Sequence, residues 1–84
     1  MIQLSEEAEN DLDGMDNDVY IRFRKHIDKI AAMPPRRHLQ HGVPFFKENV
    51  GQGRIAYLVR EDTIYIMRCF EHHKEYEKWL GQFK

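Results

Sequence analysis

The sequence has 84 residues, of which 32% are charged, and a formal net charge of −1. A chain of this length forms one small domain, and its single cysteine, Cys69, excludes an intrachain disulfide. No apolar stretch approaches the roughly 20 residues of a membrane span, and no signal-peptide pattern is present. We therefore expect a single soluble domain over residues 1–84, located in the cytoplasm and without membrane contact.

The small net charge hides an uneven distribution of charge along the chain. Residues 1–18 hold seven acidic residues and no lysine or arginine, whereas residues 19–84 hold seven acidic residues and all thirteen basic ones, a balance of +6. Such asymmetry is typical of a protein with a polyanionic ligand on one side. It is equally compatible with an acidic, solvated helix on an ordinary domain.

The chain begins with a predicted strand over residues 1–4, followed by a first helix for which Ser5 is a good N-cap. Glutamates in the first turn complement the helix dipole. The apolar stripe has the i, i+4, i+7 spacing of one helical face and comprises Ala8, Leu12 and Met15. Gly14 weakens the end of this helix.

A second helix is expected from the caps at residues 16–18 to about Met33, where Pro34 and Pro35 stop it. Its apolar face comprises Val19, Phe23, Ile27, Ile30 and Ala31. A basic, polar connection over residues 36–42 follows.

Three strands and a short helix are predicted for the rest of the chain. The strands cover residues 44–50, 54–60 and 63–68, the tight turns between them begin at Gly51 and Glu61, and the helix covers residues 73–83. Alternation in the middle strand puts Ile55, Tyr57 and Val59 on one face and Arg54, Ala56, Leu58 and Arg60 on the other. We predict an α+β fold of order β-α-α-β-β-β-(α), with two N-terminal helices on one face of a small antiparallel sheet.

The residues from Gly42 to Trp79 resemble a known family. The strand Pro44-Phe-Phe-Lys-Glu-Asn-Val50 and the segment from Arg68 through His-His-Lys-Glu-Tyr76, with the element order, resemble the RelE/ParE superfamily of type II toxin–antitoxin toxins. The resemblance implies the fold of this superfamily. For RelE-like members it also implies a ribosome-dependent, metal-free endoribonuclease that cuts mRNA and is neutralised by an antitoxin. ParE-like members share the fold but act on DNA gyrase.

The resemblance also implies roles for particular residues. Lys47 matches a basic residue on the strand that lines the RNA, and Arg54 matches the arginine that holds the scissile phosphate. The candidate catalytic residues are therefore Lys47, Arg54, Arg68, His72, His73 and Tyr76, and the candidate RNA-binding residues are Arg60, Lys74, Lys78 and Trp79. Asn49 departs from the family, because some RelE toxins carry a second lysine at that position.

Each candidate also has an ordinary structural interpretation. Arginines at strand ends commonly protect sheet edges, and Arg60 beside an acidic turn suits a surface ion pair. Tyr76 and Trp79 can belong to the core, although an aromatic face can also stack on an unpaired base. Histidine titrates near neutral pH and is suited to proton transfer, and the sequence leaves open whether His72 or His73 does this.

Two short motifs have zinc-like spacing, Cys69-x-x-His72 and His38-x-x-His41. A second cysteine is lacking, and nothing in the sequence brings the two halves together, so we expect neither a metal nor another cofactor.

The predicted function is metal-independent cleavage of mRNA by the substrate's own 2′-hydroxyl. The predicted partners are mRNA, the ribosome and a small, acidic, partly disordered antitoxin. The alternatives are a non-catalytic ParE-like toxin that binds a protein such as DNA gyrase, and an inactive domain that only binds an antitoxin.

Overall fold

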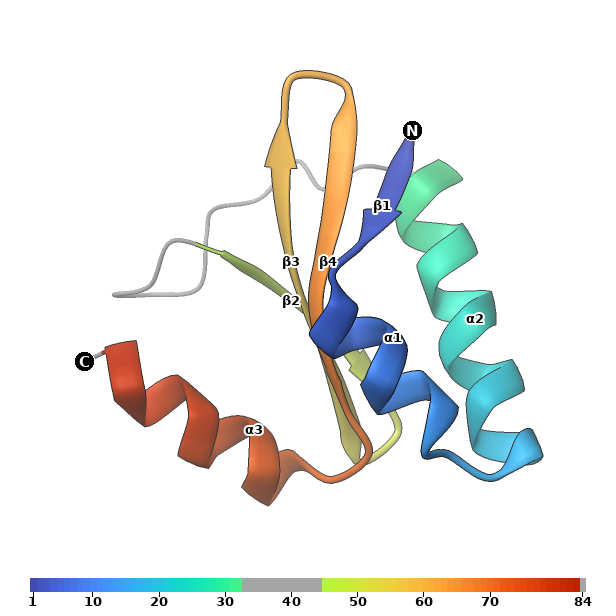
Figure 1. Ribbon diagram of the computed structural model, residues 1–84, viewed down its shortest axis with the longest axis vertical. Coiled ribbons are helices and arrows are strands. Elements are labelled where there is room, and N and C mark those ends of the chain that lie inside the picture. The colour runs from blue at the N-terminus through green and yellow to red at the C-terminus, as the bar shows by residue number, and fades with distance from the viewer. Residues whose placement is uncertain (33–44, 84) are drawn as a thin grey trace.

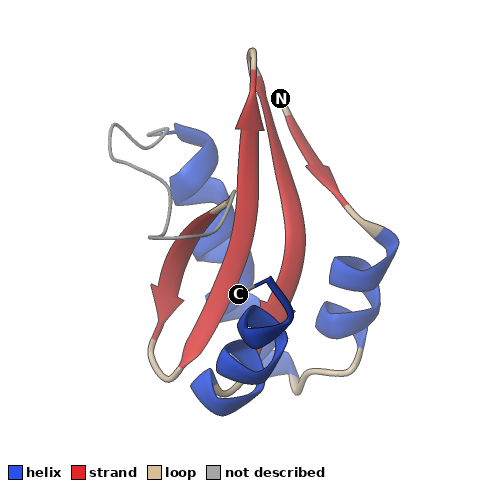
Figure 2. Cartoon of the chain, turned by 90° about the vertical axis from the view of Figure 1, so that its left-hand side faces the viewer, coloured by secondary structure: helices blue, strands red, loops and turns tan. Residues whose placement is uncertain are grey.

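The computed structural model describes residues 1–32 and 45–83 as a four-stranded sheet with helices against both faces (Figures 1 and 2). In chain order the elements are β1 (Ile2–Leu4), α1 (Glu6–Asp13), α2 (Asn17–Ala32), β2 (Phe46–Val50), β3 (Gly53–Arg60), β4 (Thr63–Phe70), α3 (His73–Leu80) and a 3₁₀ turn (Gly81–Phe83). The predicted α+β fold and element order are confirmed.

The sheet has the strand order β1-β4-β3-β2. The meander β2-β3-β4 is antiparallel as predicted, but β1 pairs with β4 in parallel, with Ile2 opposite Ile64 and Leu4 opposite Ile66. The sheet is therefore mixed rather than purely antiparallel. The reason is the long connection through two helices and the meander, which brings β4 back alongside β1 in the same direction.

One core lies between the sheet and the helices α1 and α2. Its buried members include Ala8, Leu12, Phe23, Ile27, Ile30, Ile55, Tyr57, Ile64, Ile66 and Cys69. The Ser5 hydroxyl accepts a hydrogen bond from the Ala8 amide (3.0 Å), as an N-cap does, and donates to the Met67 carbonyl (2.7 Å). Ser5 thus fixes the start of α1 on β4. Ala31 is exposed rather than buried, because Ile30 takes the core position in the last turn of α2.

A second core lies on the opposite face of the sheet, under α3. It consists of Phe45, Ala56, Phe70, Tyr76 and Leu80, with Leu58, Met67 and Trp79 packed against it. The helices thus cover both faces of the sheet, and Figure 2 shows α3 in front of the sheet with α2 behind it.

Strand β4 is two residues longer than predicted, and its last two residues face opposite cores. Cys69 belongs to the core under α1 and α2, and Phe70 belongs to the core under α3. Near this end the pairing of β3 with β4 shifts between Ala56 and Tyr57, which leaves Met67 as an extra residue in β4. The predicted helix over residues 73–83 ends at Leu80 and continues as the 3₁₀ turn, where Phe83 is 42% exposed.

Candidate active site

The candidate site lies where the β2–β3 turn meets the junction between β4 and α3. At Gly53 a Cβ atom would lie 2.6 Å from the Phe70 carbonyl oxygen and 2.6 Å from Cζ of Phe23, so a larger residue does not fit there. Gly53 is also close to the Glu71 carbonyl. This close approach brings Arg54, the next residue on β3, to the same end of the sheet as His72.

Among the described residues, the guanidinium of Arg54 is held by carbonyl groups alone. Its Nη1 donates to the carbonyl oxygens of Gly53 (2.7 Å) and Gly51 (3.3 Å). Among the residues that the structure describes, Arg54 has no carboxylate within ion-pair distance. Its positive charge is therefore positioned without being neutralised, which is what binding of a phosphate requires.

Lys47 and Asn49 extend this surface along β2. Glu48 points to the other face, where its carboxylate meets Nδ1 of His26 on α2 (2.8 Å), so its two exposed neighbours face the α3 side. In the register of the sheet, Asn49 lies opposite Arg54 and Lys47 opposite Ala56. Lys47 and Arg54 thus stand on the same face of adjacent strands.

Tyr76 is both a core residue and a neighbour of Arg54. Its side chain is 4% exposed, and its ring packs edge-on against Phe70 at a centroid distance of 5.9 Å. Burial raises the pKa of the Tyr76 phenol, and the positive charge of Arg54 partly opposes this rise. The hydroxyl has no hydrogen-bond partner among the described residues.

The two histidines of the junction lie in different surroundings. His72 is the N-cap residue of α3, its imidazole makes no capping hydrogen bond, and it lines a pocket of ≈ 330 Å³ together with Arg22, Gln52 and Glu71. His73 lies one residue further along, with its Nε2 3.8 Å from the Glu77 carboxylate one helical turn away. His72 therefore borders the β2–β3 turn, whereas His73 is engaged along the outer surface of α3.

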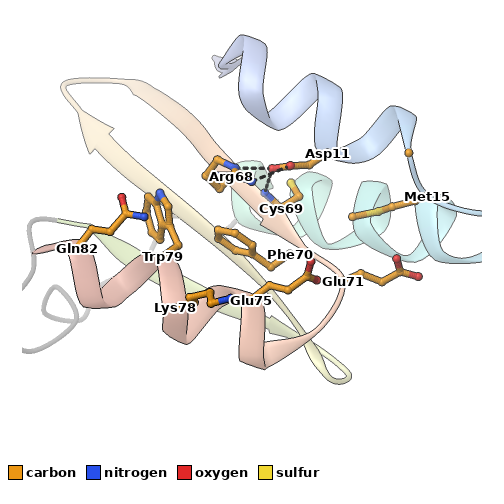
Figure 3. A pocket seen from close by; sticks show the side chains of 11 residues that line it. Asp11, Met15, Arg68, Cys69, Phe70, Glu71, Glu75, Lys78, Trp79 and Gln82 are labelled. Atoms are coloured by element: carbon orange, nitrogen blue, oxygen red, sulfur yellow. Dashed lines mark hydrogen bonds and ion pairs between the residues drawn. The ribbon is translucent and has the colours of Figure 1, made fainter.

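Arg68 does not join Arg54. Its Nε and Nη2 donate to the two carboxylate oxygens of Asp11 on α1 (2.7 and 3.0 Å), and its guanidinium lies 4.6 Å from the Phe70 ring centroid. The amide of Cys69 donates to the same carboxylate (2.9 Å), as Figure 3 shows. The hydrogen bond with Asp11 is the main reason that the pKa of Arg68 is raised. Arg68, a catalytic candidate from the sequence, is therefore paired with a carboxylate on α1 instead of standing free beside Arg54.

The remaining RNA-binding candidates are dispersed. Arg60 is exposed at the end of β3, next to the β3–β4 turn, and Lys74 is exposed in the first turn of α3. Lys78 and Trp79 line a cleft of ≈ 400 Å³ between α1 and α3 (Figure 3). None of these four residues stands beside Arg54 in the register of the sheet.

Sequence reasoning missed two residues, Arg22 and Asp11. Arg22 is not part of the apolar face predicted for the second helix, yet it lines the pocket beside His72. Asp11 looked like one of many solvated acids, although its place between the buried residues Ala8 and Leu12 signals the border of the core. That position is the one feature of the sequence that could have identified it.

The zinc motif that involves Cys69 has no structural support. The Cys69 side chain is in the core, 2% exposed, and burial raises the pKa of its thiol to about 12, so it is not a thiolate at neutral pH. Within residues 1–32 and 45–83, no three His, Cys, Asp or Glu side chains gather as metal ligands. His38 and His41, the other half of the motif, lie outside the described residues. Among the described helices, none is long and apolar enough to cross a membrane.

No protein-family model matches the sequence, and no curated protein matches it. Several solved structures are similar to this chain. The isolated RelE toxin of E. coli is similar with a TM-score of 0.74 at 14% identity, over 95% of this chain and 97% of that one. The chain has the RelE fold.

Two toxin–antitoxin complexes show the same RelE fold in their toxin chains. The RelBE2 complex from Mycobacterium tuberculosis is similar with a TM-score of 0.73 at 17% identity, over 83% of this chain and 94% of that one. The RelB–RelE complex from Methanococcus jannaschii has a TM-score of 0.70 at 17% identity, over 90% of this chain and 95% of that one.

Proposed function

We propose that the protein is a RelE-like toxin, an endoribonuclease that cleaves mRNA on the ribosome in the cytoplasm, inhibits translation and needs no metal. The observation that carries the proposal is Arg54, whose guanidinium is positioned by carbonyl groups and shares a sheet face with Lys47. A guanidinium held in position, with an exposed lysine on the same face of the adjacent strand, is suited to a phosphodiester, whose charge increases in the transition state of cleavage.

The proposed reaction uses the 2′-hydroxyl of the RNA as its nucleophile. His72 removes the hydroxyl proton, the 2′-oxygen bonds to phosphorus, and the bond from phosphorus to the 5′-oxygen breaks. Arg54 and Lys47 stabilise the dianionic transition state. The products are a 2′,3′-cyclic phosphate and a 5′-hydroxyl, and DNA is not cut because it lacks the attacking group.

The leaving 5′-oxygen needs a proton, and we assign this step to Tyr76. A phenol is protonated at neutral pH, and although burial raises the pKa of Tyr76, the positive charge of Arg54 acts to lower it and so favours release of the proton. The hydroxyl has no partner among the described residues. A protonated phenol beside a guanidinium is better suited to donate a proton than to accept one. Between the two histidines, His72 is favoured as the base because it lines a pocket with Gly51 and Gln52 of the turn that precedes Arg54, whereas His73 pairs with Glu77.

The proposal includes a cognate antitoxin, small, acidic and partly disordered. It is supported by the complexes of RelE-like chains with RelB antitoxins among the similar structures. It is also supported by the small size of the chain, since a ligand that binds only the folded state adds stability by mass action.

The test is translation of a defined mRNA in vitro with the purified chain, followed by mapping of RNA ends. We expect new 5′-hydroxyl ends within translated messages, insensitivity of cleavage to EDTA once ribosomal magnesium is restored, and no cutting of DNA. His72→Ala should lower the rate about 10²-fold, whereas His73→Ala, the matched control one residue away, should change it by less than about threefold.

Other outcomes point to the two alternatives. Intact mRNA together with inhibited DNA supercoiling by gyrase would identify a ParE-like toxin. If mRNA stays intact, supercoiling by gyrase is unchanged and the chain still binds the product of the neighbouring gene, the protein is an inactive antitoxin-binding domain.

A further inference from the structure

A second surface of the molecule lies on the opposite side of α3 from Arg54. It is an open cleft of ≈ 400 Å³ between α1 and α3, whose floor is the end of β4 (Figure 3). A neighbouring hollow of ≈ 390 Å³ shares Arg68, Trp79 and Gln82 with the cleft and extends it towards the start of α1. The two form one groove between the helices, which we call the α1–α3 groove.

The α1–α3 groove is acidic. Four described carboxylates line it, contributed by Glu7, Asp11, Glu71 and Glu75. The described cations of the groove are Arg68 and Lys78, and Arg68 is already neutralised by Asp11 through two hydrogen bonds. The groove therefore repels a polyanion, although it contains Lys78 and Trp79, two residues whose types suit RNA binding.

Apolar side chains line the groove between these charged residues. Trp79 and the 42% exposed Phe83 pack edge-on at 4.9 Å and form one wall. Met15 and Met67, both half-buried, lie on the other side and on the floor. Flexible thioethers beside aromatic rings are typical of surfaces that receive the apolar side chains of a peptide.

We infer that the α1–α3 groove binds a cationic, amphipathic peptide segment of a protein partner. Leucine-like side chains of the segment pack on Trp79 and Phe83, and its lysines or arginines pair with Glu7 and Glu75 at the rims. Complementary charge selects this occupant over RNA. The inference does not depend on catalysis, since none of these residues belongs to the proposed active site around Arg54.

Trp79 makes the inference directly measurable, because it is the single tryptophan of the chain and lies in the groove. The probe is a synthetic helical peptide of about 18 residues, roughly five helical turns, with leucine on one face and lysine on the other. The comparison peptide has glutamate in place of every lysine. We expect a saturable change in Trp79 emission with the lysine peptide, weakened by salt, and at least tenfold weaker binding of the glutamate peptide.

Matched charge variants locate the binding surface. Glu7→Gln combined with Glu75→Gln should weaken the lysine peptide about tenfold, since both carboxylates line the groove. Glu6→Gln combined with Glu77→Gln makes the same change of net charge at exposed neighbours that do not line it, and should change affinity less than about twofold. Unfolding midpoints of both double variants establish that each is folded.

Three results would overturn the inference. The first is equal weakening by the two double variants, which reports only net charge. The second is a Trp79 response to single-stranded RNA stronger than the response to the lysine peptide, which assigns the groove to nucleic acid. The third is no saturable response to the lysine peptide at all. Each result leaves the proposed ribonuclease activity untouched, because that activity is read from RNA ends in a separate assay.

Discussion

An arginine lies on each side of α3, and the two differ in whether a carboxylate neutralises the positive charge. Arg54 lies on β3 opposite Phe70, and Arg68 lies on the adjacent antiparallel strand β4 opposite Ala56. The two arginines are therefore only two positions apart along the strands. Arg54 is held by two carbonyl oxygens and keeps its charge available, whereas Arg68 forms a bidentate pair with Asp11. An arginine becomes an anion site only where no carboxylate reaches it first, so the function of each is decided by its neighbours.

The pair of Asp11 and Arg68 also completes the sheet. The short strand β1 pairs with β4 only as far as Ile66, so none of the described strands neighbours this edge of β4 beyond that point. The Asp11 carboxylate accepts the Cys69 amide there and fills the place that a strand carbonyl would take. One side chain thus neutralises Arg68, satisfies a backbone donor and fixes α1 against β4.

The largest expected effect is on the Arg54 side. Arg54→Ala should lower mRNA cleavage by about 10²–10³-fold, because a preorganised cation facing developing charge contributes several kcal/mol. Arg60→Ala removes the same side chain from the exposed end of the same strand and should cost no more than about fivefold. The measurement is the rate of appearance of cleaved ends at equal folded protein. Wild-type cleavage by the Arg54 variant would remove the proposed phosphate site.

The second prediction concerns stability on the other side of α3. Asp11→Ala should lower the free energy of unfolding by about 2–3 kcal/mol, because it leaves the Arg68 charge and the Cys69 amide without their partner. Arg68→Ala should cost about 1–2 kcal/mol, and the double variant should cost less than the sum of the two. Asp13→Ala, an exposed position in the last turn of α1, is the control and should stay within about 0.5 kcal/mol.

Urea unfolding gives these values, and cleavage measured on folded protein separates the two arginines. If Arg68 only supports the fold, its alanine variant keeps the cleavage rate of the folded fraction. A loss of rate as large as that of Arg54→Ala would show that Arg68 leaves Asp11 to meet the substrate, and the comparison between the two sides would fail.

Local signals in the sequence predicted most of the fold. The Ser5 cap, the glycine turn before Arg54 and the alternation along β3 depend on near neighbours, and the structure confirms each of them. The position of Arg68 away from the site was harder to predict, because the contact that holds it there joins residues 57 positions apart, Asp11 and Arg68. Periodicity does not reveal which carboxylate of an acidic helix meets a given arginine.

The second core, under α3, could not be predicted from local sequence signals either. The i, i+4 spacing of Tyr76 and Leu80 is that of one apolar helix face, but it does not indicate which face of the sheet α3 covers. That choice depends on Phe70, which the sequence placed after the strand rather than in it. Extension of β4 by two residues turns Phe70 towards α3 and Cys69 towards α1, and this alternation brings α3 to the face that carries Arg54.

The smallest expected effect is the loss of stability over the single pH unit from 9 to 10, which reports on the α1 side of β4. Burial raises the pKa of the Cys69 thiol from 9.0 to about 12 in the folded chain. Between these values the folded state keeps a proton that the unfolded state releases. The stabilisation is therefore complete below pH 9 and is lost as pH rises towards 12, at a slope of at most about 1.4 kcal/mol per pH unit.

The buried phenols of Tyr57 and Tyr76 act in the same direction, since their pKa values are also raised, but from 10.0. The thiol therefore begins to titrate at lower pH than the phenols, and the comparison with Cys69→Ala separates its contribution from theirs. Cys69→Ala should be less stable than the wild type at pH 8, because a buried side chain is truncated. Its unfolding free energy should nevertheless fall less steeply between pH 9 and 10, because the titrating group is gone. Parallel profiles for the two proteins would mean that water reaches the thiol, and that the contact of α1 with the end of β4 opens in solution.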